Sequence, residues 1–138
     1  MKTIILTLSL FIGLAANAAN TSKTLVCLMG DIANMDIVIS SNDKGNEKIH
    51  VRLFTGMNGN GVMTVYKNSN FKNSQLSQSL EKGSIDTIVS KSDLSEIFGG
   101  AYLKAGILKM TETKEKGRYD VLFAAQNTVY TANCGEIK

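Results

Sequence analysis

Polar and apolar residues alternate with a period of two through most of this chain, the pattern of strands buried on one face. The clearest run is 48–53, where Ile49, Val51 and Leu53 alternate with charged or polar residues. Weaker versions of the same pattern occur along the rest of the sequence. Together they predict seven or eight short strands, over residues 24–29, 35–39, 48–53, 62–67, 85–90, 105–113, 119–125 and 128–134.

The segments between these runs carry turn residues and little helical periodicity. Turns are predicted at 42–46, 114–118 and 126–127, which are rich in Asn, Asp, Lys and Gly. Leu76 and Leu80 are four residues apart within the polar stretch 68–83, a spacing that allows one helical turn. Residues 93–98, followed by two glycines, predict a second, capped helical turn.

Many short strands and short connections indicate an all-β fold, a small antiparallel barrel or sandwich of about seven to eight strands. We favour the barrel, in which the first and last strands lie side by side. Residues 119–125 carry apolar side chains on both faces, because Leu122 and Ala124 alternate with the inward set. That predicts a central strand, or one covered by the segment 68–83.

The first 18 residues have the pattern of a secretory signal peptide. A basic Lys2 precedes an apolar run, and Ala16-Asn17-Ala18 provides a small-residue cleavage site. The run is shorter than the roughly 20 apolar residues of a membrane span. We therefore expect residues 1–18 to be removed, and residues 19–138 to form a single exported domain that is periplasmic or secreted.

Cys27 and Cys134 are the only two cysteines, and they lie near the two ends of the expected mature domain. Export places them in an oxidising compartment, where cysteines pair. We expect one disulfide that joins the terminal strands. Lipidation of Cys27 is less favoured, because Val26 precedes it and Cys27 is only the ninth residue after the cleavage point.

The charge balance narrows the classes of partner. Fifteen Lys and Arg residues face 12 Asp and Glu residues, interspersed along the chain, for a net charge of +3. Nucleic-acid binding needs a concentrated basic footprint, which is missing here. The same balance gives no strong attraction to anionic lipid, and no transmembrane segment is expected in the mature chain.

Residues that could support catalysis or metal binding are few. His50 is the only histidine and is predicted on a strand face between cations, so no metal site or nucleophile–base pair is expected. Asp31 with Asp36, or Asp86 with Asp93, are the candidate carboxylate pairs for a hydrolase. Residues 42–47 superficially resemble a calcium loop but lack its ligand spacing. No catalytic residue, metal or cofactor is predicted.

Four residues are candidates for binding a partner. Met57 lies in a glycine-rich loop, where an adaptable thioether can make contacts. Phe71 stands alone in a polar stretch and is either a core plug, which we favour, or an exposed anchor. Tyr102 and Lys104 fall on one side of an extended segment, a pairing that suits protein recognition but also an ordinary strand start.

The sequence thus predicts a small exported, non-enzymatic binding or inhibitor module that recognises a protein partner through loops on a disulfide-linked β scaffold. One alternative is a carrier that holds a small apolar ligand inside a barrel. Others are a hydrolase with one of the carboxylate pairs and a structural component of the cell envelope.

Overall fold

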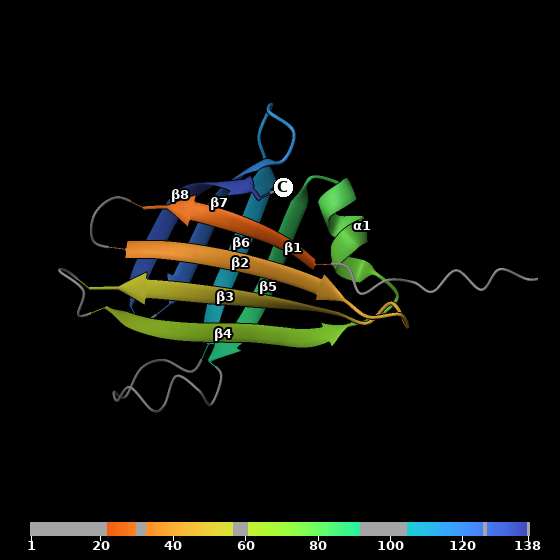
Figure 1. Cartoon of the computed structure of the whole chain (residues 1–138), viewed down its shortest axis with the longest axis horizontal. Helices are drawn as coiled ribbons and strands as arrows, with labels where there is room; N and C mark the ends of the chain where they lie inside the picture. The colour runs from red at the N-terminus through yellow and green to blue at the C-terminus, as the bar shows by residue number, and fades with distance from the viewer. Residues whose placement is uncertain (1–21, 30–32, 57–60, 92–104, 126, 138) are drawn as a thin grey trace, which may run out of the picture.

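Eight strands and one short helix make up the structure, a computed structural model that describes residues 22–29, 33–56, 61–91, 105–125 and 127–137. The helix, α1, spans Gln75–Glu81. The strands, labelled in Figure 1, are Ser22–Leu28 (β1), Ala33–Ser41 (β2), Glu47–Thr55 (β3), Val62–Phe71 (β4), Ser84–Lys91 (β5), Ala105–Glu112 (β6), Arg118–Ala125 (β7) and Thr128–Glu136 (β8).

The strands form a closed antiparallel barrel in the order β1 to β8. Each strand pairs with its neighbours in sequence, and β8 returns to pair with β1 over Leu25–Leu28 and Asn133–Glu136. This confirms the expected all-β class. Of the two expected architectures, a barrel or a sandwich, the structure is the barrel. The alternation in the sequence matches the outcome, because inward residues of β3 are buried at Ile49, Val51 and Leu53.

The barrel is flattened into two walls. Strands β1–β4 run across the view of Figure 1, and β5–β8 run steeply behind them. The antiparallel order places the β2–β3 and β6–β7 connections, α1, the start of β1 and the end of β8 at one end, here called the α1 end. The ends of β1, β3, β5 and β7 and the starts of β2, β4, β6 and β8 lie at the other, here called the opposite end.

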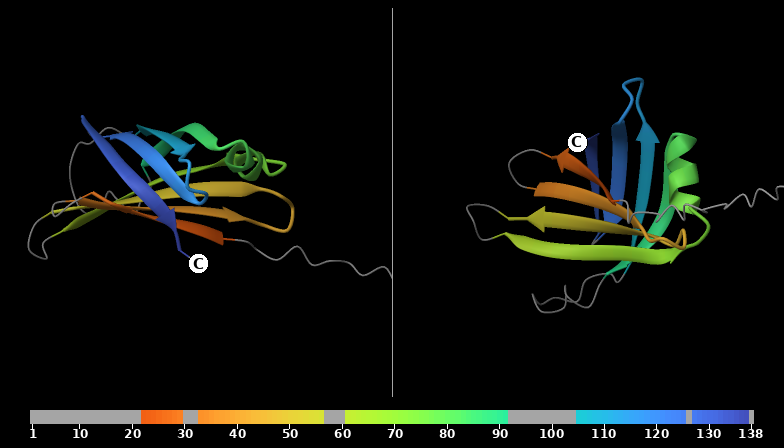
Figure 2. Two further views of the ribbon diagram at one scale, coloured as in Figure 1. Left: turned by 90° about the horizontal axis from the view of Figure 1, so that it is seen from above. Right: turned by 45° about the vertical axis from the view of Figure 1, so that its right-hand side comes forward.

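The two walls separate at the seam between β4 and β5. Their ladder has only two residue pairs, Tyr66 with Lys91 and Lys67 with Ser90. Beyond it the Asn68 amide bridges the gap by donating to the Ile88 carbonyl oxygen at 2.9 Å. Helix α1 packs against β5 and β3 at this seam, as the two views of Figure 2 show, and its Leu76 is fully buried.

Side chains from both walls meet inside the barrel and form one cluster of buried residues. The rings of Tyr66 and Phe123 meet edge to face, with centroids 5.1 Å apart, and Tyr130 stacks on Phe123 at 6.3 Å. Gly106 allows this packing, since a Cβ there would stand 2.8 Å from Phe123 Cε2. An eight-stranded barrel is just wide enough for side chains to fill it, and here they do.

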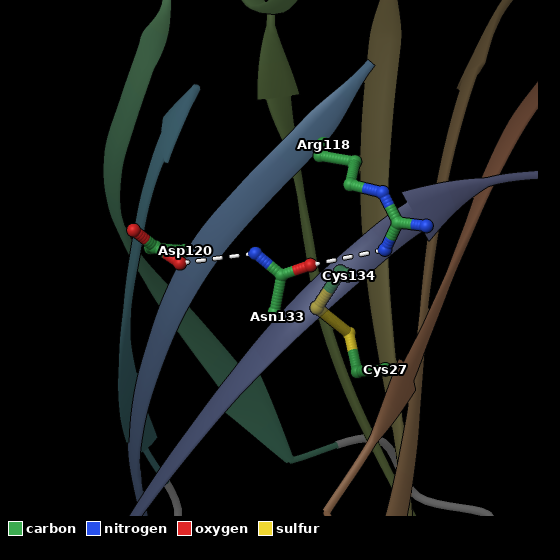
Figure 3. Close-up of a disulfide and its surroundings, with 5 residues drawn as sticks. All are labelled: Cys27, Arg118, Asp120, Asn133 and Cys134. Carbon is green, nitrogen blue, oxygen red and sulfur yellow. Dashed lines mark hydrogen bonds between the residues drawn. A yellow bond between two sulfur atoms is a disulfide. The ribbon is translucent and has the colours of Figure 1, made fainter. Parts of the chain in front are cut away.

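The disulfide between Cys27 and Cys134 is present and joins paired residues of β1 and β8 (Figure 3). Both cysteines are completely buried. The expected link between the terminal strands is therefore confirmed. It crosses the one ladder that joins strands far apart in the sequence.

The helical turn that the spacing of Leu76 and Leu80 allows is present as α1, which is seven residues long. Leu76 is buried and Leu80 packs partly against the core, so the four-residue spacing marks the inner face. The helical turn predicted at 93–98 lies outside the described residues.

Candidate functional site

One carboxylate of each proposed catalytic pair, Asp36 or Asp86, is described, and each of these two forms an ion pair with a basic side chain. Asp36 of β2 pairs with Arg52 at 3.0 Å, and Asp86 of β5 pairs with Lys109 at 3.2 Å. Their proposed partners, Asp31 and Asp93, lie outside the described residues. A carboxylate neutralised by its own cation is typical of a structural ion pair.

His50 lies half-buried on the outer face of β3, opposite Lys67 of β4. Burial lowers the pKa of the imidazole, and the charges of Lys48, Lys67 and Arg52 lower it further. The ring is thus neutral at pH 7 and surrounded by cations, an environment that also disfavours a bound metal ion.

The segment that resembles a calcium loop is a hairpin turn. The Asn42 side-chain oxygen accepts hydrogen bonds of 3.0 Å from the backbone N–H groups of Lys44 and Asn46. Gly45 has a φ of +71°, which closes the turn. Within the described residues, no group of three or more His, Cys, Asp or Glu side chains is placed to hold a metal ion.

Of the four candidate binding residues, only Phe71 falls within the described part of the chain. It is half-buried at the end of β4 and packs against the core, as the plug alternative expects. Met57, Tyr102 and Lys104 lie outside the described residues. In the sequence, Met57 falls between β3 and β4, and Tyr102 and Lys104 fall between β5 and β6.

Near the opposite end of the barrel, an apolar row crosses the outer wall formed by four strands. The ladders pair Ile88 with Ile107, Ile107 with Ala124, and Ala124 with Val129, so these four residues, the apolar row, are successive neighbours across β5–β8. Ile88 is 63% exposed, Ile107 46% and Val129 60%. Large aliphatic side chains aligned on an outer wall form a contiguous patch, which marks interaction sites more often than scattered exposure does.

The apolar row lines a groove of about 580 Å³. Ala124 gives it a low floor between the larger Ile107 and Val129. None of the described residues that line it is charged.

Charge increases along the same wall toward the α1 end. The next row includes the Asp86–Lys109 ion pair. Beyond it, Asn133 accepts from Arg118 at 3.2 Å and donates to Asp120 at 3.1 Å (Figure 3). The wall is thus polar at one end and apolar at the other.

The inside of the barrel also changes character, at the α1 end. In the middle of the strands the inward residues are apolar: Leu25, Ile49, Met110, Val121 and Cys134. Two positions further toward the α1 end, the residues on the same face are polar: Lys23, Glu47, Glu112, Tyr119 and Glu136. These five residues line a cavity of about 530 Å³, here called the mouth cavity.

Glu47 connects this layer to α1. Its carboxylate is 2% exposed and accepts hydrogen bonds from the backbone N–H of Leu76 at 2.6 Å, the N–H of Ser77 at 3.2 Å and the Ser77 hydroxyl. The first residues of a helix leave N–H groups without partners inside the helix. Glu47 therefore caps α1 from a neighbouring strand.

Other polar groups of the mouth cavity are only partly engaged. Lys23 Nζ pairs with Glu136 Oε2 at 3.0 Å, and Glu112 Oε1 accepts the Gly117 N–H at 3.0 Å. Tyr119 is 3% exposed and lines the cavity. Burial raises the pKa of its phenol; Lys23 acts in the opposite direction, and Glu112 and Glu136 add to the rise.

Sequence reasoning missed both the apolar row and the mouth cavity. The second apolar face of β7 was a signal for the row, but its outward residue Leu122 is 37% exposed rather than covered. The mouth cavity also had a signal in the sequence. At several strand ends a charged or phenolic residue lies two positions from a core residue, as Lys23 and Glu112 do.

Comparisons with protein-family models, with curated proteins and with solved structures gave no match. In the described part of the chain, no helix combines the length and apolar character needed to cross a bilayer.

Proposed function

We propose that this protein is an exported, non-enzymatic binding module that recognises a protein partner through the apolar row. The observation that carries the proposal is the alignment of Ile88, Ile107, Ala124 and Val129 across four strands of one rigid wall. A disulfide-linked barrel holds these side chains in fixed positions, which lowers the entropy lost on binding.

The chemistry of the groove specifies the contact that the partner makes. An inserted ammonium or carboxylate would lose its water without meeting an opposite charge, because the described lining is uncharged. An aliphatic or aromatic side chain fits the low floor at Ala124, between Ile107 and Val129. We therefore propose a protein that places such a side chain over Ala124, as buried anchors do at other interfaces.

Two other classes of function have less support. The hydrolase alternative is weakened because Asp36 and Asp86 each pair with a base. The carrier alternative is weakened because Tyr66, Phe123 and Tyr130 occupy the barrel interior.

The test compares two substitutions at equally exposed β-branched residues. Val129→Ser alters the apolar row, where Val129 is 60% exposed, and Ile137→Ser alters the chain after β8, where Ile137 is 58% exposed. The oxidised wild-type protein is first used to capture partners from envelope and secreted material. We expect a stoichiometric protein that Ile137→Ser binds with unchanged affinity and Val129→Ser binds roughly tenfold more weakly or worse.

Equal affinity for both variants would overturn the assignment of the surface. Two further outcomes would overturn the nature of the occupant: sedimentation equilibrium that shows a dimer lost in Val129→Ser, or neutral lipid vesicles that bind the wild type and not Val129→Ser. Both positions are exposed, so similar melting temperatures are the check that neither variant is misfolded.

A further inference from the structure

The mouth cavity is separate from the apolar row and lies at the α1 end of the barrel. Its apolar floor includes Ile39 and Leu80, and its polar layer comes from the inward ends of β1, β3, β6, β7 and β8. A volume of about 530 Å³ is within the range of sites for small ligands. The cavity is therefore large enough to take a group from outside the chain.

The charges around this cavity do not balance. Its described lining contains four glutamates and two lysines. Glu136 pairs with Lys23, and Glu47 is engaged by the N–H groups of α1. Glu81 and Glu112 then remain without an ion pair to any described residue, against the exposed Lys116. One additional positive charge would balance this set.

A second observation, independent of the carboxylates, also indicates a ligand. Tyr119 is 97% buried, being 3% exposed, yet its hydroxyl forms no hydrogen bond with another described residue. It lines the cavity and pairs across the ladder with Glu112. The residue is buried as a whole and lines the cavity, so its hydroxyl is available to a group inside the cavity, to which it can donate or from which it can accept.

Glu81 and Glu112 both line the cavity, and the backbone segments that carry them are joined by a hydrogen bond. The Glu112 N–H donates to the carbonyl oxygen of Gly83 at 2.7 Å, and Gly83 follows α1 two residues after Glu81. Two carboxylates and a phenol oxygen supply three acceptors, and a primary ammonium has three donors. The Lys23–Glu136 pair already shows an ammonium bound in this layer.

We propose that the mouth cavity binds a primary alkylammonium group, with its charge at Glu81 and Glu112, its third hydrogen bond to the Tyr119 hydroxyl, and its aliphatic stem on Ile39 and Leu80. Such a group occurs in free monoamines and in the lysine side chains of peptides. The apolar row plays no part in this binding, so the proposal is independent of the protein-binding function.

Calorimetric titration of the oxidised protein with n-pentylamine tests the proposal, with 1-pentanol as an uncharged control of the same shape. We expect pentylamine to bind at one site and pentanol to bind at least about tenfold more weakly, since a hydrogen bond to a charged group is worth that much. Equal binding of the two compounds, or no binding of pentylamine, would overturn the proposal.

Matched variants locate the site. Tyr119→Phe removes only the hydroxyl, and Glu81→Gln removes a charge from an exposed position of α1; each is expected to weaken pentylamine binding about tenfold. Tyr130→Phe removes a hydroxyl that does not line the cavity and should bind like the wild type. Unchanged affinity in both cavity variants would overturn the assignment. Glu81→Gln keeps the result interpretable if Tyr119→Phe unfolds.

A further arm distinguishes the two sources of the ammonium. Nα-acetyl-lysine methylamide presents a lysine side chain together with its backbone. Tighter binding of this compound than of pentylamine supports a lysine of a peptide as the occupant, and weaker binding supports a free amine. Either result is consistent with an alkylammonium site, and failure of both compounds to bind contradicts it.

Discussion

Individual residues on the outer wall of β3 and β4 give this barrel a defined response to acid. His50 is the only histidine of the chain, and its neutral form is favoured by burial and by three surrounding cations. In the unfolded chain these influences are lost, so the unfolded state binds a proton near the ordinary pKa of 6.5 while the folded state does not. Protonation of His50 thus favours unfolding.

We predict an imidazole titration midpoint below 6.5 in the folded protein, measured by NMR. Lys67→Gln should raise the midpoint only in part, because burial is the larger cause of the shift. The free energy of unfolding should fall as the pH drops below 6.5, and His50→Gln should remove the histidine share of that fall. A folded midpoint at or above 6.5 would contradict this account.

For single residues, the sequence predicted which face of a strand a side chain lies on. It did not predict which residues of other strands that side chain contacts. The cations on either side of His50 were visible in the run 48–53, but Lys67 comes from another strand. Glu47 ends the segment 42–47 that superficially resembles a calcium loop, whereas in the structure it is buried against α1. Contacts between residues far apart in sequence depend on register, which one sequence does not reveal.

Among the elements, α1 is capped at its N-terminus by a single side chain of β3, Glu47. It is only seven residues long, and helices of this length do not form alone in water. Ser74, at its N-cap, makes no side-chain capping bond, so the Glu47 carboxylate supplies the acceptor for the first N–H groups.

We predict that Glu47→Gln lowers the free energy of unfolding by about 1–3 kcal/mol, because a neutral amide with one acceptor replaces a carboxylate with two. Amide exchange at Leu76 and Ser77 should accelerate more than exchange in β7. Glu81→Gln is the matched control on the same helix, and its exposed side chain should leave both urea unfolding and exchange unchanged. Equal behaviour of the two variants would contradict the capping role.

The strands themselves were the most predictable elements, and the seam was the least. Alternation in 48–53 and 119–125 identifies β3 and β7 without further information. Alternation does not predict the short β4–β5 ladder. This ladder has only two residue pairs, and beyond them Asn68 reaches the Ile88 carbonyl oxygen with its side chain instead of its backbone. The apolar row could not be predicted either, because its residues become neighbours only when four strands align.

For the whole molecule, the disulfide is a covalent constraint that acts on the unfolded chain. Cys27 and Cys134 are 107 residues apart, and closing a loop of ~100 residues removes roughly 4–5 kcal/mol of unfolded-state entropy in the chain-entropy model. We predict that the double variant Cys27→Ala/Cys134→Ala melts on the order of 15 °C below the oxidised wild type.

Reduction of the wild type, confirmed by mass spectrometry after unfolding and refolding in reductant, should reproduce this lower melting temperature. The double variant also separates the loss of the covalent link from any effect of the reductant. Melting temperatures equal to that of the oxidised protein in both samples would contradict a stabilising role for the bridge.

The order of the strands has a consequence for how the chain folds. Seven of the eight ladders join consecutive strands and can zip as local hairpins, and only the β1–β8 ladder must bring together distant parts of the chain. Because the cysteines sit opposite each other in that ladder, the pairing of β1 with β8 brings them together. The disulfide therefore keeps joined the two strands that are most distant in the sequence, so that the ring cannot open at this ladder while the bond is intact.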